Sequence, residues 1–245
     1  MAIASEWPRI SALGTDGFLV TFADRLNEPA NRAALAFRHA LDREGWSAVE
    51  ETSTSLVSAY LRFDPRGSSH AEIRENLAHL LSRENWLDAP LPQGRRLWRV
   101  PAVFGTEMAP QLEEAAQAAG LTPKEAIASL TRSPVRVQTI GFAPGQPYLG
   151  ELPPAWDIPR QSKLTSQVPA GALAVAIRQL VLFPVPAPTG WRHVAQTCFQ
   201  LFHPDTDEPF VLRPGDELQV ESVGAETLER MKADPNGGAR AEAIR

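Results

Sequence analysis

The side chains best suited to chemistry gather in three loops rich in proline and glycine. The loops are GFAPGQPYLG (141–150), DIPRQSKLTSQVPAG (157–171) and FPVPAPTGWRHVAQT (183–197). Rigid loops at strand ends often carry the binding groups of a scaffold. Their long polar side chains are Tyr148, Arg160, Lys163, Arg192 and His193. If the loops meet in space, these side chains form one binding surface.

The chemistry of such a surface would suit a small anion. Phe142, Tyr148 and Trp191 would supply aromatic walls, and the arginines a positive rim. Arginine can grip a carboxylate or phosphate through two parallel hydrogen bonds. The alternative is a set of ordinary β-turns with surface arginines, and the residue pattern alone leaves both open.

Several common kinds of site are excluded by pattern. HxH, HExxH and CxxC are absent, so a protein-built metal site is not expected. The phosphate-binding GxxxxGK[ST] and GxGxxG motifs and the hydrolase motif GxSxG are absent too. Cys198, the single cysteine, sits in an alternating apolar run and is expected to be a structural thiol rather than a nucleophile.

Composition narrows the class of protein. The 245 residues carry a net charge of -5, and the arginines are scattered, which argues against a nucleic-acid partner. One cysteine allows no internal disulfide, so a reducing compartment is expected. We find no leader-like N-terminus and no apolar run of the roughly 18 residues that a membrane span needs. These features predict a cytoplasmic protein without a membrane partner.

The first part of the chain alternates strand and helix patterns. One helix is predicted from the Asn27 cap to Gly45, and another opens at the capping box of Ser69 and Glu72. The order strand, helix, strand, strand, helix, strand is that of a ferredoxin-like sandwich, which we assign to residues 1–95. The strands are GFLVTFA (17–23), WSAVEE (46–51), SLVSAYLRFD (55–64) and RLWRVPAVF (96–104).

From about residue 105 the pattern changes. Two short helices are predicted, one ending at Gly120 and one opening at the capping box of Thr122 and Glu125. Short strand-like runs follow without helices between them, which indicates a closed or folded-over β structure. The runs are 135–142, 172–183, 197–202 and 210–220. We assign residues 96–223 to this second domain and expect residues 224–245 to form a frayed tail.

Motifs spread over residues 10–222 resemble a known family, the small subunit of the bacterial 5-oxoprolinase and allophanate-hydrolase group. That group includes KipI, an inhibitor of a sporulation histidine kinase. The resemblance implies an α+β fold, a ferredoxin-like α/β domain followed by a cyclophilin-like β-barrel. The motifs are GF-x-PG-x-PYLG, PR followed by VPAG, P-x-GW and PF-x-L-x-PGD, and the matching residues are Pro144, Gly145, Pro147 to Gly150, Pro159, Arg160, Val168 to Gly171, Pro188, Gly190, Trp191 and Pro214 to Asp216.

The resemblance also implies a function and a set of roles. Family members work beside a larger homologous subunit (PxpC- or KipA-like), and 5-oxoprolinase opens 5-oxoproline to glutamate at the expense of ATP. For this chain it implies a small carboxylate or amide substrate and ATP shared with the partner subunit. Arg160 would hold a carboxylate or phosphate, Tyr148 would donate a hydrogen bond and His193 would transfer protons. The other expected ligand-binding residues are Phe142, Pro144, Gly145, Gln146, Lys163, Gly190, Trp191, Arg192 and Gln196.

The chain departs from the family pattern at several positions near the expected site. Gln146 stands where phenylalanine is usual and Gln196 where arginine is usual. Leu164-Thr165, Phe183 and Thr189 also differ from the pattern. Since these changes remove polar groups, two alternatives to an enzyme subunit stay open: a KipI-like regulator of a histidine kinase, and a catalytically degenerate structural subunit.

Overall fold

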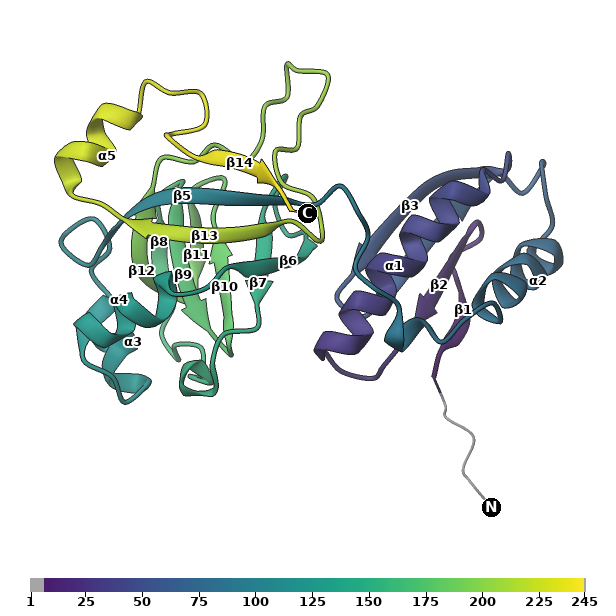
Figure 1. The fold of residues 1–245 in the computed structure, drawn as a ribbon, viewed down its shortest axis with the longest axis horizontal. Coiled ribbons are helices and arrows are strands. Elements are labelled where there is room, and N and C mark those ends of the chain that lie inside the picture. The colour runs from purple at the N-terminus through teal and green to yellow at the C-terminus, as the bar shows by residue number, and fades with distance from the viewer. Residues whose placement is uncertain (1–6, 245) are drawn as a thin grey trace. The chain divides into compact units, whose positions relative to one another are not determined.

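The protein folds as two compact units, with the division between Gln93 and Gly94 (Figure 1). The structure is a computed structural model, and it describes residues 7–244. Each unit has its own hydrophobic core. The first is an antiparallel sheet with two long helices, and the second is a closed β-barrel with short helices at its periphery, so the predicted α+β fold class is confirmed.

The first unit contains a sheet with the strand order of a ferredoxin-like fold. Among the described residues this antiparallel sheet has the order β1-β2-β4-β3. The edge strand beside β2 comes from the N-terminal side of the unit, not from residues 96–104 as the sequence pattern suggested. The elements are β1 (Arg9–Leu13), β2 (Gly17–Thr21), α1 (Glu28–Glu44), β3 (Val49–Ser55), β4 (Ser58–Phe63), α2 (His70–Leu81) and the short 3₁₀ turn η1 (Trp86–Asp88).

Both helices of the first unit begin as their caps predict. The Asn27 side chain accepts a hydrogen bond from the Ala30 amide at 2.9 Å, and α1 ends at Gly45 in the left-handed conformation. Ser69 and Glu72 form the reciprocal capping box at the start of α2. The apolar faces of α1 and α2 bury Phe37 and Leu77 in a core shared with the sheet.

The second unit holds the barrel and most of the described elements. They are β5 (Arg96–Phe104), α3 (Leu112–Ala118), α4 (Pro123–Thr131), β6 (Val135–Ile140), β7 (Pro147–Gly150), η2 (Pro154–Trp156), β8 (Thr165–Val168), β9 (Ala172–Ala176), β10 (Gln179–Leu182), β11 (Ala187–Thr189), β12 (Arg192–Thr197), β13 (Glu217–Ser222), α5 (Ala225–Met231) and β14 (Arg240–Ala243). The predicted helices before the barrel are present as α3 and α4, and α4 begins with the capping box of Thr122 and Glu125.

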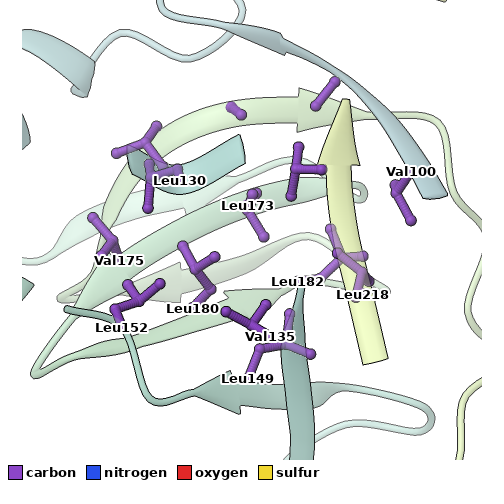
Figure 2. Packing of buried hydrophobic residues seen from close by; sticks show 14 of the residues in the cluster. Val100, Leu130, Val135, Leu149, Leu152, Leu173, Val175, Leu180, Leu182 and Leu218 are labelled. Atoms are coloured by element: carbon purple, nitrogen blue, oxygen red, sulfur yellow. The ribbon is translucent and has the colours of Figure 1, made fainter. Parts of the chain in front are cut away.

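The barrel closes because β12 pairs with β5 at the far end of the strand order. The described order is β12-β9-β10-β7-β6-β13-β5, with β14 added outside on β5. Strand β5 is nearly buried along its second half, which suits a closed barrel better than the edge of the first sheet. Leu149, Leu173, Leu180 and Leu218 are among the side chains that fill the interior (Figure 2).

The outer face of β9 is lined by small residues. Leu173 and Val175 point into the barrel, whereas Ala172, Ala174 and Ala176 belong to a separate buried cluster outside it. The cluster also contains Val168 of β8 and Ala187 of β11, so the small β8–β11 sheet packs on this face. A strand alternates its side chains between two faces, and here both faces are buried.

The predicted run 172–183 is a hairpin rather than one strand. Ile177 and Arg178 form its turn between β9 and β10, with φ of 44° and 59°. Two residues of positive φ are typical of a type I′ turn, which asparagine and glycine usually supply. Hydrogen bonds from the Ile177 and Arg178 amides to the Ile158 and Trp156 carbonyls, at 2.8 and 2.9 Å, hold the turn in place.

A buried carboxylate joins the start of β5 to the start of β13. Asp216, which is 2% exposed, accepts hydrogen bonds from the Arg96 guanidinium at 2.6 Å and the Arg96 amide at 2.9 Å. It also accepts one from the Arg213 amide at 3.1 Å. Because each oxygen of this buried charge has a donor, the two parallel strands are fixed end to end.

The C-terminal segment is folded, which corrects the prediction of a frayed tail over residues 224–245. Helix α5 buries Leu228 completely, and β14 pairs antiparallel with β5 (Figure 1). The segment looked too polar to fold because its own sequence offers few apolar residues. Strand β5 supplies the missing partner through backbone hydrogen bonds, which the composition of the tail does not reveal. Among the helices of residues 7–244, none is long and apolar enough to cross a membrane.

The role of the tail can be tested at Leu228. Leu228→Ala should lower the free energy of unfolding of the second unit by about 2–5 kcal/mol, because a fully buried leucine leaves a cavity. The matched variant Val185→Ala, at a side chain that is 44% exposed, should change it by less than about 0.5 kcal/mol. Urea unfolding measures both, and equal small effects would show that the tail adds nothing to the fold.

Candidate functional site

The loop GFAPGQPYLG is a tight turn fixed by its own backbone. The Gly141 amide donates to the Gln146 carbonyl at 3.0 Å, and the Gln146 amide donates to the Ala143 carbonyl at 3.0 Å. Gly145 has a φ of 76°, and a Cβ atom there would lie 2.7 Å from the Leu201 carbonyl oxygen. Phe142 also has a positive φ, 75°, and its side chain is 78% exposed. A bulky residue held in this conformation is a mark of a binding loop.

The three proline-rich loops meet around one cavity of about 180 Å³, which we call the loop cavity. Gln161 joins the second loop to the third, because its amide donates to the Gly190 carbonyl at 2.7 Å and its side chain to the Trp191 carbonyl at 3.1 Å. Tyr148 of the first loop packs edge-on against Trp191, with ring centres 6.2 Å apart. The lining residues are Phe142, Gln146, Tyr148, Arg160, Leu164, Val181, Phe183, Pro188, Thr189, Gly190 and Trp191.

Arg160 gives the loop cavity a positive charge. Its guanidinium carbon lies 5.3 Å from the centre of the Trp191 ring, so the side chain is oriented over an aromatic face. No carboxylate among the described residues forms an ion pair with Arg160. A guanidinium that is oriented but not neutralised can bind a carboxylate or phosphate through two hydrogen bonds.

Gln146 is the buried polar group of the loop cavity. The residue is 2% exposed, and its Oε1 atom has no hydrogen-bond partner among the described residues. An unpartnered buried acceptor costs about 1–3 kcal/mol unless a ligand or water satisfies it. Gln146 therefore offers an acceptor for an N–H or O–H group of a bound molecule.

Some of the predicted site residues do not reach this cavity. Arg192 instead pairs with Glu114 of α3 at 2.8 Å and donates to the Pro159 carbonyl at 2.6 Å, so its charge is already used. Lys163 is exposed and does not line the cavity, and Pro144 and Gly145 shape the first loop without lining it. The predicted single pocket is corrected accordingly.

His193 and Gln196 line a second, larger cavity of about 560 Å³, which we call the bulge cavity. Its other lining residues are Glu107, Met108, Pro110, Gln111, Thr165, Gln167, Val168, Pro169, Thr197, Cys198 and Lys232. The structure therefore separates His193 from Tyr148 and Arg160, with which we had grouped it as catalytic. Burial lowers the pKa of His193 and raises the pKa of the Cys198 thiol, so both are neutral near pH 7.

Sequence reasoning missed the apolar floor of the loop cavity and all of the bulge cavity. Val181 and Phe183 reach the loop cavity because β10 returns beside β7, which follows from the unexpected hairpin. The alternation ALAVA in residues 172–176 was the available signal, since alanine at every second position marks a face packed close to another element. No cluster of three or more potential metal ligands occurs within residues 7–244.

Comparison with known proteins identifies the family. Residues 8–212 match the model of the carboxyltransferase domain, subdomain C and D. The chain belongs to this family.

Relatives of this carboxyltransferase-domain member include two curated 5-oxoprolinase subunits and a solved structure. The chain is 28% identical over 242 residues to the 5-oxoprolinase subunit of Bacillus subtilis, covering 93% of this chain and 98% of that protein. It is 36% identical over 124 residues to the corresponding protein of Escherichia coli O157:H7, covering 51% of this chain and 57% of that one. The crystal structure of TTHA0988 is 31% identical with a TM-score of 0.70, and the match spans 85% of this chain but 40% of TTHA0988.

The unpartnered Gln146 acceptor predicts a trade between stability and binding. Gln146→Met should leave the free energy of unfolding unchanged or raise it, because an apolar group of similar shape replaces an unsatisfied one. In the matched variant Gln138→Met, the Gln179 amide loses the acceptor that it contacts at 2.8 Å, and unfolding should become easier by about 1–3 kcal/mol. Thermal and urea unfolding of both variants measure this. A Gln146→Met loss as large as that of Gln138→Met would mean that Oε1 is satisfied within the protein.

His193 predicts a pH dependence of stability. Its pKa is lowered from an ordinary value of 6.5, so below pH 6.5 the unfolded chain binds a proton that the native chain does not yet bind. The free energy of unfolding therefore rises with pH in that window and falls on acidification, by at most about 1.4 kcal/mol per pH unit. His193→Gln should flatten this slope between pH 7 and the native pKa, whereas His39→Gln, at an exposed position, should keep it. Urea unfolding at several pH values tests this, and equal slopes in His193→Gln and the unmodified protein would contradict it.

Proposed function

We propose that this chain is the small subunit of an ATP-dependent amidohydrolase resembling 5-oxoprolinase, and that its loop cavity holds the carboxylate end of the substrate. The observation that carries the proposal is the unpaired Arg160 guanidinium oriented over Trp191 in a cavity built by three loops. The near full-length similarity to a protein named as a 5-oxoprolinase subunit supports the substrate class.

The size of the loop cavity favours a small metabolite. Its volume of about 180 Å³ is below the roughly 300–1,000 Å³ of pockets for drug-sized ligands. A five-membered lactam acid such as 5-oxoproline has nine non-hydrogen atoms, and its carboxylate would face Arg160. Gln146 Oε1 and the Tyr148 hydroxyl would then be the polar groups left for the rest of the molecule.

The loop cavity does not contain a complete set of catalytic groups. Apart from Arg160 and Tyr148, none of its described lining residues is ionisable, and His193 lies in the bulge cavity. Ring opening of a lactam needs an activated nucleophile and a proton donor for the leaving nitrogen. This chain therefore contributes binding and orientation, and the larger homologous subunit contributes the remaining groups.

The described residues do not form a nucleotide site. The loop cavity is too small for ATP, and the chain has no phosphate-binding glycine loop. We therefore assign ATP to the larger subunit or to a surface that it completes, and derive no step through ATP from this chain.

A regulatory role is the second candidate, and exposed apolar side chains favour it. Phe142 and Leu164 at the loop cavity are 78% and 63% exposed. Such residues are suited to burial against another protein, either the larger subunit or a histidine kinase.

The test is substrate-dependent ATP hydrolysis by the chain co-expressed with its larger homologue. We expect a stable complex that hydrolyses ATP when 5-oxoproline is added. Arg160→Ala should raise KM for 5-oxoproline about 10–100-fold, the loss expected for a charged hydrogen bond. Its melting temperature should stay nearly unchanged, because Arg160 has no acidic partner among the described residues to lose.

The control is Arg213→Ala, which removes an exposed arginine paired with Glu208 on the same unit and should leave KM unchanged. A complex that forms but stays silent with 5-oxoproline would favour the structural role. Inhibition of histidine-kinase autophosphorylation by the isolated chain would favour the regulatory role. A large loss of stability in Arg160→Ala would show that Arg160 is structural.

A further inference from the structure

The bulge cavity has the features of a second binding site, independent of the loop cavity. Its volume of about 560 Å³ lies within the roughly 300–1,000 Å³ range of small-molecule pockets. Two of its lining side chains, His193 and Gln196, are 4% and 9% exposed. His193 Nε2 and Gln196 Oε1 both lack a hydrogen-bond partner among the described residues.

A β-bulge places these two side chains on one face of β12. His193 and Gln196 are three residues apart, so in a regular strand they would point to opposite faces. The pairing of β12 with β9 shifts register between His193 and Ala195, and His193 and Gln196 then pair with Ala174 and Ala172. Both alanines belong to the outer face of β9. Bulges re-aim side chains in this way beside functional sites.

The Gln196 amide has a fixed orientation. Its Nε2 atom donates to the Ala170 carbonyl at 2.8 Å and to the Thr197 carbonyl at 2.9 Å. Turning the amide over would set Oε1 against two carbonyl oxygens, so Oε1 is an obligate acceptor. Gly171, with a φ of 79°, lets the chain pass this close, because a Cβ atom would lie 2.2 Å from the Thr197 carbonyl oxygen.

His193 lies beside that acceptor in a fixed position. Its backbone amide donates to Gln111 Oε1 at 2.9 Å. The Gln196 side chain acts to raise the pKa of His193 against the larger effect of burial, which requires the two groups to be neighbours. Nε2 and Oε1 are therefore adjacent polar atoms, each without a completed hydrogen bond.

The charges around the bulge cavity favour an uncharged ligand. Glu107 and Lys232 have opposite charges, and Lys232 is already paired with Glu229. His193 and Cys198 are neutral near pH 7 because burial opposes their charged forms. Met108, Pro110, Val168 and Pro169 give the cavity an apolar wall.

We propose that the bulge cavity binds an uncharged cyclic amide through its N–H and C=O edge. The ring N–H would donate to Gln196 Oε1, and the carbonyl would accept from His193 Nε2–H. A ring holds the amide in the cis form, so its donor and acceptor lie side by side, as Oε1 and Nε2 do. An open-chain trans amide points them in opposite directions. The apolar wall would contact the methylene groups of the ring.

The test uses γ-butyrolactam as the probe with the full-length chain labelled with ¹⁵N-histidine. Titration should shift the ring nitrogens of His193 and should show Nε2 as the protonated nitrogen. N-methyl-γ-butyrolactam and γ-butyrolactone, which lack the N–H donor, should bind at least tenfold more weakly, because the buried Oε1 would stay unpaired. Equal affinity for the three compounds would overturn the proposal.

Two variants locate the binding. Gln196→Met should weaken γ-butyrolactam binding at least tenfold, while Gln200→Met, at an exposed position outside both cavities, should leave it unchanged. If Gln196→Met fails to fold, the comparison of the three compounds with the unmodified protein still decides. Shifts at the Trp191 indole instead of His193 would place the ligand in the loop cavity and overturn the proposal. So would the absence of any His193 shift at saturating probe. Since the assay needs neither ATP nor a partner, its outcome is separate from that of the 5-oxoprolinase proposal.

Discussion

The packing of the β8–β11 sheet against the alanine face of β9 is the constraint on which both cavities depend. Ala172, Ala174 and Ala176 are fully buried, although they lie outside the barrel. Their small side chains allow a second layer to lie close to the barrel wall, and close packing leaves little freedom for that layer to move. The loop cavity includes Thr189 of β11 and the bulge cavity Val168 of β8, so one layer positions residues in both.

The elements that could be predicted from sequence are those fixed by local interactions. Asn27, Ser69 and Thr122 cap helices through bonds that span three residues, and all three caps are present. What escaped prediction depends on distant partners. The β1 edge strand, the tail strand β14 and the Ile177–Arg178 turn are each held by segments that their own sequence does not specify. Backbone pairing with remote strands outweighs local preference in these cases.

The same distinction explains the site. The loop motifs predicted which residues would gather, and Phe142, Gln146, Tyr148, Arg160 and Trp191 do line one cavity. Arg192 was misplaced because its partner Glu114 lies 78 positions away, on a helix of another segment. His193 was misplaced because a register shift decides which face of β12 it occupies. A bulge is a property of two paired strands, so a single strand sequence cannot show it.

The two cavities divide charge and hydrogen bonding between them. The loop cavity holds an unpaired guanidinium, whereas the bulge cavity holds neutral groups and a balanced pair of charges. A hydrogen-bonded chain connects them: Gln111 accepts from the His193 amide and donates to Gln161, which donates to the Trp191 carbonyl. A change at either end of this chain would alter the orientation of the Gln161 amide, which both loops share. Because neither cavity combines an anion-binding group with a proton-transfer group, the fold separates recognition from catalysis. A catalytic role for this chain therefore requires a second subunit that brings acid–base chemistry to a bound anion.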